Sequence, residues 1–276
     1  MALRVLCLHG MGTDSSILQA QISHFLNLLP DCYYSFTFPD GPVLCDASPG
    51  VADHHPGPYR CWFNTPTNAK VSQAYSWVRR KILQNGAPFD VVIGFSQGAA
   101  LAAGMLLHQQ IEDPHAPPLF RAAMFICSPL PFACVPQYGI DVGRYFGVEP
   151  VRAGRRPTTV PEYLVAEAYF LRNDKELEGE DEEEADSTDS ETGDTKAGPF
   201  YNMFHPSVDE VRIRIPTAHV YGRKDVWRRH SMELRGLCCL RNQIEFEHDG
   251  GHEVPRSASE EICDLFQELI MRAGLV

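Results

Sequence analysis

Short apolar runs alternate along the chain with longer segments in which apolar residues recur every three or four positions. The runs are typical of strands buried on both faces of a sheet, and they fall at residues 3–8, 33–38, 90–94, 121–127, 215–221 and 244–248. The longer segments are typical of helices with one apolar face, and they fall at residues 18–29, 71–82, 98–107 and 262–270. This alternation predicts an α/β domain whose mainly parallel sheet carries helices on both faces.

The alternation stops between residues 129 and 210, which we interpret as an insertion that forms a lid. The part before residue 170 holds enough apolar and aromatic residues to pack over another surface. Residues 173–198 contain almost no large apolar side chain, so we expect them to be a disordered acidic loop. A length of 276 residues suits one large α/β domain, so residues 1–276 are interpreted as a single domain that includes the insertion at 129–210.

Most of the acidity of the chain is concentrated in one segment. Residues 174–196 hold twelve acids and two lysines, so they supply −10 of the formal net charge of −12 and leave −2 for the rest. A nearly neutral body argues against a nucleic-acid surface. No apolar run approaches the roughly 20 residues of a membrane span. The nine cysteines form no C-x-x-C pair, and no histidine cluster has zinc spacing. We therefore expect reduced thiols, a cytoplasmic location, no metal and no cofactor.

The clearest chemical signal is a G-x-S-x-G motif placed between an apolar strand and a helix of small residues. It reads Gly94-Phe95-Ser96-Gln97-Gly98. A serine on such a sharp strand-to-helix turn has a strained backbone, needs small neighbours and leaves its hydroxyl exposed above the sheet. The motif therefore predicts Ser96 as a nucleophile.

A serine hydroxyl is a weak nucleophile, so it needs a base, and the base needs an acid to orient it. Asp225 follows the run at 215–221, and His252 follows the last run after paired glycines. The chain order Ser96, Asp225, His252 is that of the α/β-hydrolase fold. Asp249 is a competing acid, disfavoured because it shares the loop of His252. The competing bases, interpreted as strand or surface histidines, are His219, His230 and His248.

Hydrolysis also requires donors for the oxyanion that develops on the substrate. The backbone amide after the nucleophile and one from the loop after an early strand usually supply them, and here these belong to Gln97 and Met11. His9 in the same loop is interpreted as a structural hydrogen-bonding residue. Aromatic residues of the long loop and of the insertion could line an acyl pocket, although ordinary packing explains each of them equally well. They are Trp62, Phe63, Phe132, Tyr138, Tyr145 and Phe146. Arg152, Arg155 and Arg156 are interpreted as a solvated basic turn rather than a phosphate site.

Four segments of the chain resemble the fungal family of small serine hydrolases related to the ovarian-cancer-associated hydrolase. They are LCLHGMGT, GFSQGAA, RIPTAHVYGRKD and GGHEVPR, and the resemblance spans nearly the whole chain. It implies Ser96 as nucleophile, Asp225 as acid, His252 as base and the Met11 and Gln97 amides as oxyanion hole. The chain looks like the members found in polyketide biosynthetic clusters, which implies a thioesterase or hydrolase that acts on an acyl group, such as one held on a synthase carrier domain. The long acidic stretch at 173–198 is a feature that compact members of the family would lack. The resemblance therefore does not predict the shape of the lid.

Two other functions are compatible with the sequence. The same triad could serve a general carboxylesterase or a deacylase of lipids or proteins. The fold could also be reused as a non-catalytic binding protein. A binder has no physical need to keep serine, aspartate and histidine together at the catalytic positions, so the sequence favours the enzyme.

Overall fold

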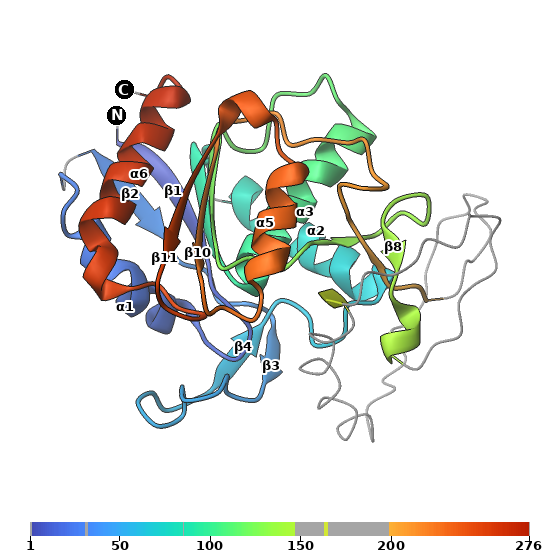
Figure 1. Ribbon diagram of the computed structural model, residues 1–276, viewed down its shortest axis with the longest axis horizontal. Coiled ribbons are helices and arrows are strands. Elements are labelled where there is room, and N and C mark those ends of the chain that lie inside the picture. The colour runs from blue at the N-terminus through green and yellow to red at the C-terminus, as the bar shows by residue number, and fades with distance from the viewer. Residues whose placement is uncertain (1, 31–32, 85, 147–162, 165–198, 276) are drawn as a thin grey trace.

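The computed structural model describes residues 2–30, 33–84, 86–146, 163–164 and 199–275 (Figure 1). The acidic loop expected to be disordered at 173–198 and the arginines at 152, 155 and 156 lie outside the described residues.

A parallel sheet of six strands forms the centre of the molecule, with the order β11-β10-β6-β5-β1-β2. Its strands are β1 (Leu3–Leu8), β2 (Tyr34–Thr37), β5 (Val91–Phe95), β6 (Ala122–Ile126), β10 (Thr217–Gly222) and β11 (Gln243–His248). From β1 the chain passes outward to the edge strand β2, then crosses to β5 on the other side of β1 and continues to β11. The carboxyl ends of β1 and β5 therefore flank the point where the strand order reverses, where open α/β sheets bind their ligands.

Helices cover both faces of this sheet, as the periodicity predicts (Figure 1). Helices α1 (Ser15–Leu26) and α6 (Ser259–Arg272) pack on one face, against side chains such as Val5 and Ile93. Helices α2 (Asn68–Gln84), α3 (Gln97–Glu112) and α5 (Arg228–Gly236) lie on the other, where the alternate residues Leu6 and Val92 belong to a second core cluster. Two apolar layers thus hold the sheet, because successive strand residues point to opposite faces.

Two small sheets and a helix were not expected from the sequence. The long loop after β2 contains an antiparallel hairpin of β3 (Val43–Cys45) and β4 (Tyr59–Cys61). The described part of residues 129–210, the expected insertion, forms a sheet of β7 (Phe132–Ala133), β9 (Asn202–Met203) and β8 (Ile140–Asp141), here called the insertion sheet. Short 3-10 helices occur at η1 (Gly143–Phe146), η4 (Leu240–Asn242) and η5 (Arg256–Ala258). These strands are too short for periodicity to show, and α5 is mostly polar.

The insertion sheet packs on the α2 and α3 side of the molecule, where β7 contacts both helices. Phe132, Ile140 and Leu164 of the expected insertion are buried in the same core cluster as residues of α2 and α3. The extent of the insertion at 129–210 and its action as a lid remain predictions. None of the described helices combines the length and the apolar character that crossing a bilayer requires.

Two substitutions in helix α6 measure how much the apolar layer contributes to the free energy of unfolding. Phe266 is completely buried and its ring contacts those of Phe25 and Tyr34. We expect Phe266→Ala to lower the free energy of unfolding by about 3 to 5 kcal/mol, because it removes buried apolar area and leaves a cavity. Met271 on the same helix is 60% exposed, so Met271→Ala should stay within about 0.5 kcal/mol. Urea unfolding measures both, and equal losses would contradict the assignment of the buried face.

Candidate active site

Ser96 lies on a sharp turn between the carboxyl end of β5 and the first residue of α3. Its backbone has φ 51° and ψ −121°, a conformation that residues with a Cβ rarely adopt. A Cβ added to Gly94 would come within 2.4 Å of Ala99 Cα, and one added to Gly98 would come within 2.1 Å of Leu8 O. Both glycines of the motif are therefore required by backbone contact, and the turn is strained as the motif predicts.

Three side chains from distant parts of the chain form one hydrogen-bonded line at this turn. Ser96 Oγ lies 2.9 Å from His252 Nε2, and His252 Nδ1 lies 3.0 Å from Asp225 Oδ1. The carboxylate of Asp225 is completely buried, whereas 30% of the His252 side chain is exposed. A carboxylate only accepts hydrogen bonds, so Nδ1 carries the proton, and Nε2 is left free to accept the serine hydroxyl proton.

The loops that carry the aspartate and the histidine are joined by main-chain hydrogen bonds. Arg223 N donates to His248 O at 2.8 Å, and Lys224 N donates to Gly250 O at 2.9 Å. A Cβ on Gly222 would come within 2.3 Å of Gly251 O, so the two loops approach closely only because Gly222 has no side chain. The carboxylate is held in turn by Trp227 N, which donates to Asp225 Oδ1 at 2.8 Å.

The competing acid and bases lie elsewhere. Asp249 is an exposed residue whose side chain is 88% accessible and pairs with Arg223 Nη1 at 3.2 Å. His219 is completely buried, and burial lowers its pKa to about 3. His230 Nδ1 accepts from Leu130 N, and His248 Nδ1 accepts from Gly250 N. Of the described histidines, His252 is the one whose ring nitrogen is within hydrogen-bonding distance of Ser96.

The loop after β1 lies directly against the nucleophile turn. A Cβ added to Gly10 would come within 3.2 Å of Ser96 Cβ. The amides of Met11 and Gln97 donate no hydrogen bond to any other residue that the structure describes, so both could serve a ligand. His9 is completely buried, accepts from Gly41 N at its Nε2 atom (2.8 Å), and lies with Nδ1 2.7 Å from Gly10 O. Burial lowers the pKa of His9. These contacts fit the structural role expected for it.

The side chain of Gln97 ties the nucleophile turn to the loop before α2, a contact that sequence reasoning missed. Its Oε1 atom accepts from Trp62 N at 2.9 Å, and its Nε2 atom donates to Phe63 O at 2.7 Å. The indole N–H of Trp62 donates to His9 O at 2.8 Å. The signal in the sequence that could have indicated this contact is the polar residue Gln97 at the start of an otherwise apolar helix. The network connects the turn, the aromatic loop and the loop after β1.

The aromatic residues proposed for an acyl pocket have different surroundings. Trp62 is buried and its ring meets that of Trp77, so it packs in the core. Phe63 and Phe132 meet edge to face at 6.4 Å between ring centroids. Tyr138 packs against Phe204. Phe132 also meets Phe146, which stacks on Tyr201 at 4.5 Å. A row of rings thus runs from Phe63 into the insertion sheet, and its contact with an acyl group remains a prediction.

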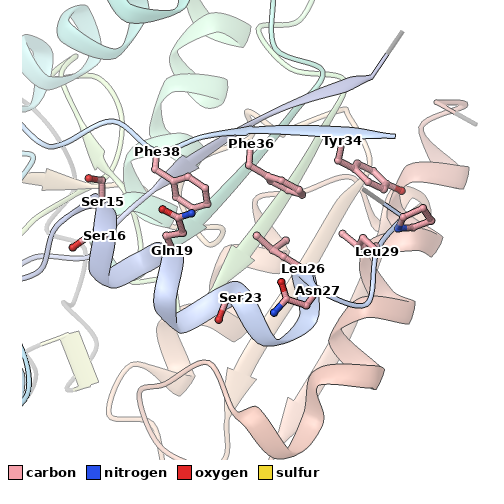
Figure 2. Close-up of a pocket in the computed structure, with 11 residues that line it drawn as sticks. Ser15, Ser16, Gln19, Ser23, Leu26, Asn27, Leu29, Tyr34, Phe36 and Phe38 are labelled. Carbon is pink, nitrogen blue, oxygen red and sulfur yellow. The ribbon is translucent and has the colours of Figure 1, made fainter. Parts of the chain in front are cut away.

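The structure also contains a groove of 630 Å³ that includes none of the hydrogen-bonded residues Ser96, Asp225 and His252. Figure 2 shows it between α1 and the edge strand β2, with Tyr34, Phe36 and Phe38 along the strand side. No pattern in the sequence predicts this groove. One set of three metal-type side chains in the described part of the chain has ligand atoms within 4.8 Å of one another, namely Cys127, Asp225 and His252. Because two of these already bind each other, we assign no metal to them.

Comparisons with known proteins identify a family and relatives to which this chain is similar. A family model described as "Serine hydrolase (FSH1)" matches residues 1–262. The esterase alnB of Emericella nidulans is 31% identical over 93% of this chain and 92% of its own length. The hydrolase FUB4 of Fusarium oxysporum f. sp. lycopersici is 29% identical over 98% of this chain and 97% of its own.

A solved structure supports the fold alone. The monoacylglycerol lipase of Paleococcus ferrophilus has a TM-score of 0.51 and 14% sequence identity, and the match covers 98% of this chain and 94% of that protein. The α/β-hydrolase fold and the family resemblance expected from the sequence are thereby confirmed. The family model covers residues 1–262, and the fold is a parallel sheet with helices on both faces. The chain therefore belongs to the FSH1 serine hydrolase family, and it is a hydrolase that acts on ester bonds.

Proposed function

We propose that this protein cleaves acyl esters or thioesters by covalent catalysis, with Ser96 as nucleophile, His252 as base and Asp225 as orienting acid. The observation that supports this best is the continuous hydrogen-bonded line from Ser96 Oγ through both ring nitrogens of His252 to Asp225 Oδ1. Such a line joins a nucleophile, a base and the group that orients the base, which is the arrangement that activates a serine.

In the proposed reaction, Ser96 Oγ forms a bond to the acyl carbon as its proton passes to His252 Nε2. The carbonyl oxygen becomes an oxyanion, and the amides of Met11 and Gln97 donate to it. The bond to the leaving group then breaks, and the protonated His252 gives its proton to the leaving alcohol or thiol. A water attacks the acyl-enzyme by the same route, with His252 again as base, and releases the acid while Ser96 regains its proton.

The burial of Asp225 gives this mechanism an electrostatic basis. Its carboxylate is removed from solvent, so its negative charge acts on the neighbouring imidazole with little screening by water. The charge favours the imidazolium that forms when His252 accepts the serine proton. His252 is partly exposed on its other side, where a leaving group and the attacking water can reach it.

The names of the relatives and the aromatic residues of the chain point to a substrate class. The relatives carry the names esterase and hydrolase, and the resemblance noted in the sequence extends to thioesterases of polyketide pathways. We propose a hydrophobic acyl group, presented as a small ester or as a thioester on a carrier domain. The row of rings from Phe63 to Tyr201 would contact it, and the insertion at 129–210 would act as the lid. A general carboxylesterase or a deacylase is the alternative that a substrate panel separates.

The nucleophile assignment predicts a complete loss on removal of one oxygen atom. Ser96→Ala should abolish both turnover of an acyl ester and labelling by a fluorophosphonate, because no other atom can form the covalent bond. Ser23→Ala, on α1 in the groove that includes none of Ser96, Asp225 and His252, is the matched control and should keep both. Mass spectrometry of the labelled protein identifies the modified residue, and labelling of the Ser96→Ala variant at another serine would refute the assignment.

The acid assignment is tested by comparing two aspartates on adjacent loops. Asp225→Asn should lower kcat by about 10³ to 10⁴-fold while the fold stays intact, because an amide can hold the imidazole in the wrong tautomer. Asp249→Asn should lower kcat by less than about twofold, since Asp249 makes an exposed ion pair with Arg223. Steady-state kinetics and circular dichroism of both variants provide the measurement. A larger loss with Asp249→Asn would identify the other carboxylate as the acid.

The acyl-enzyme predicts a relation between leaving groups and acyl chains. Matched esters and thioesters of one acyl group share a single deacylation step, so their kcat values should converge where deacylation limits turnover. If the pocket is apolar, each added methylene should raise kcat/KM until the pocket is full. The gain corresponds to a decrease of up to about 0.8 kcal/mol in the activation free energy, because each buried methylene contributes about that much. A chain-length series of both ester types measures this, with Ser96→Ala correcting for spontaneous hydrolysis. Preference for acetyl over every longer chain would exclude a hydrophobic acyl pocket.

A further inference from the structure

Cys127 follows β6 immediately and has an unusual backbone. Its φ is 50°, and among the described residues Ser96 is the other non-glycine residue with a positive φ. Strained conformations of this kind persist where the surroundings impose them, and they gather at functional sites. The amide of Cys127 donates to Val220 O of β10 at 2.8 Å, and its side chain is completely buried. The residue is therefore fixed between two strands, at the carboxyl end of the sheet where Ser96 also lies.

The thiol of Cys127 lies between the two loops that carry the proposed acid and base. Its Sγ atom donates to Glu253 O at 3.5 Å, and Glu253 is the residue after His252. Ligand atoms of Cys127, Asp225 and His252 all lie within 4.8 Å of one another. One buried side chain thus contacts the histidine loop and adjoins the carboxylate.

The carboxylate beside it has an oxygen that needs a donor. Asp225 Oδ1 accepts from His252 and from Trp227 N, whereas Asp225 Oδ2 is buried without a hydrogen-bond partner in the part of the chain that the structure describes. Leaving a charged oxygen buried and unpaired is costly. Burial raises the pKa of the Cys127 thiol well above its usual value, and the charge of Asp225 raises it further. The thiol is therefore neutral at pH 7, and it keeps a proton that it can donate.

We propose that Cys127 is a positioning residue for the acid and base. Its single S–H proton is shared between Glu253 O of the histidine loop and the carboxylate of Asp225, so that Asp225 Oδ1 stays directed at His252 Nδ1. A charged or bulky side chain at this place would push the two loops apart. The inference rests on the proposed triad and adds to it a contact between the buried thiol and the carboxylate of Asp225.

Three substitutions of Cys127 and one of a distant cysteine test this role. Cys127→Ala removes the donor, and Cys127→Gly removes it while suiting the positive φ, so a folded variant without the thiol is obtained in either case. Cys127→Ser restores an O–H donor. Cys7 is a completely buried thiol of β1 that packs in the apolar core, so Cys7→Ala is the matched control for loss of a buried sulfur. Steady-state kinetics, the rate of fluorophosphonate labelling and thermal unfolding are measured for all four.

We expect Cys127→Ala and Cys127→Gly to lower kcat and the labelling rate by about tenfold with KM within twofold, as loss of a donor to a charged group predicts. Cys127→Ser should recover to within about threefold of wild type, and Cys7→Ala should keep full kcat even if it is less stable. Wild-type kcat in both thiol-free variants, an equal loss in Cys7→Ala, or no recovery in Cys127→Ser would each overturn the proposal. Turnover by Ser96→Ala would instead overturn the triad itself, so the two failures are distinguishable.

Discussion

The hydrogen bond between Ser96 and His252 joins residues 156 positions apart and depends on the strained turn at Ser96. That turn exists because Gly94 and Gly98 let the backbone of β5, α3 and β1 come into contact. The strand order places this contact at a ligand-binding position, because successive strands are added on one side of β1 before β5 and on the other side from β5 onward. A serine at this point faces the open end of the sheet, with the loop after β1 on one side and the loops after β10 and β11 on the other.

Pairing of the two later loops is the second requirement of the site. The carboxylate of Asp225 is buried, and a buried charge is stable only with partners. Its partners come from His252, from Trp227 N and, in our proposal, from the thiol of Cys127. The parallel register of β10 and β11 sets the loops side by side, and Gly222 lets them touch. The geometry of the acid and base is thus determined by strand pairing more than by the loops themselves.

The nucleophile turn is also tied to the aromatic part of the molecule. Gln97 connects it to the backbone of Trp62 and Phe63, and the indole of Trp62 reaches the loop after β1. From Phe63 a row of rings continues through Phe132 into the insertion sheet. The turn and the short sheet of β7, β8 and β9 are therefore joined by packed side chains and buried hydrogen bonds, which have little freedom to adjust.

Local features of the chain were enough to predict the class of the protein. Apolar runs and helical spacing depend on neighbouring residues alone, so they predicted the parallel sheet and most of its helices. The motif around Ser96 and the chain order of Ser96, Asp225 and His252 predicted three residues that the structure brings within hydrogen-bonding distance of one another. The hairpin in the long loop, the insertion sheet and α5 were missed, because short strands and a mostly polar helix carry no clear periodicity.

Only the tertiary structure decided that Asp225 faces the histidine while Asp249 faces solvent, that Gln97 holds the aromatic loop, and that Cys127 adjoins the carboxylate. Each of these is a contact between segments far apart in the sequence, and such contacts arise from sheet order and packing, which no local pattern encodes.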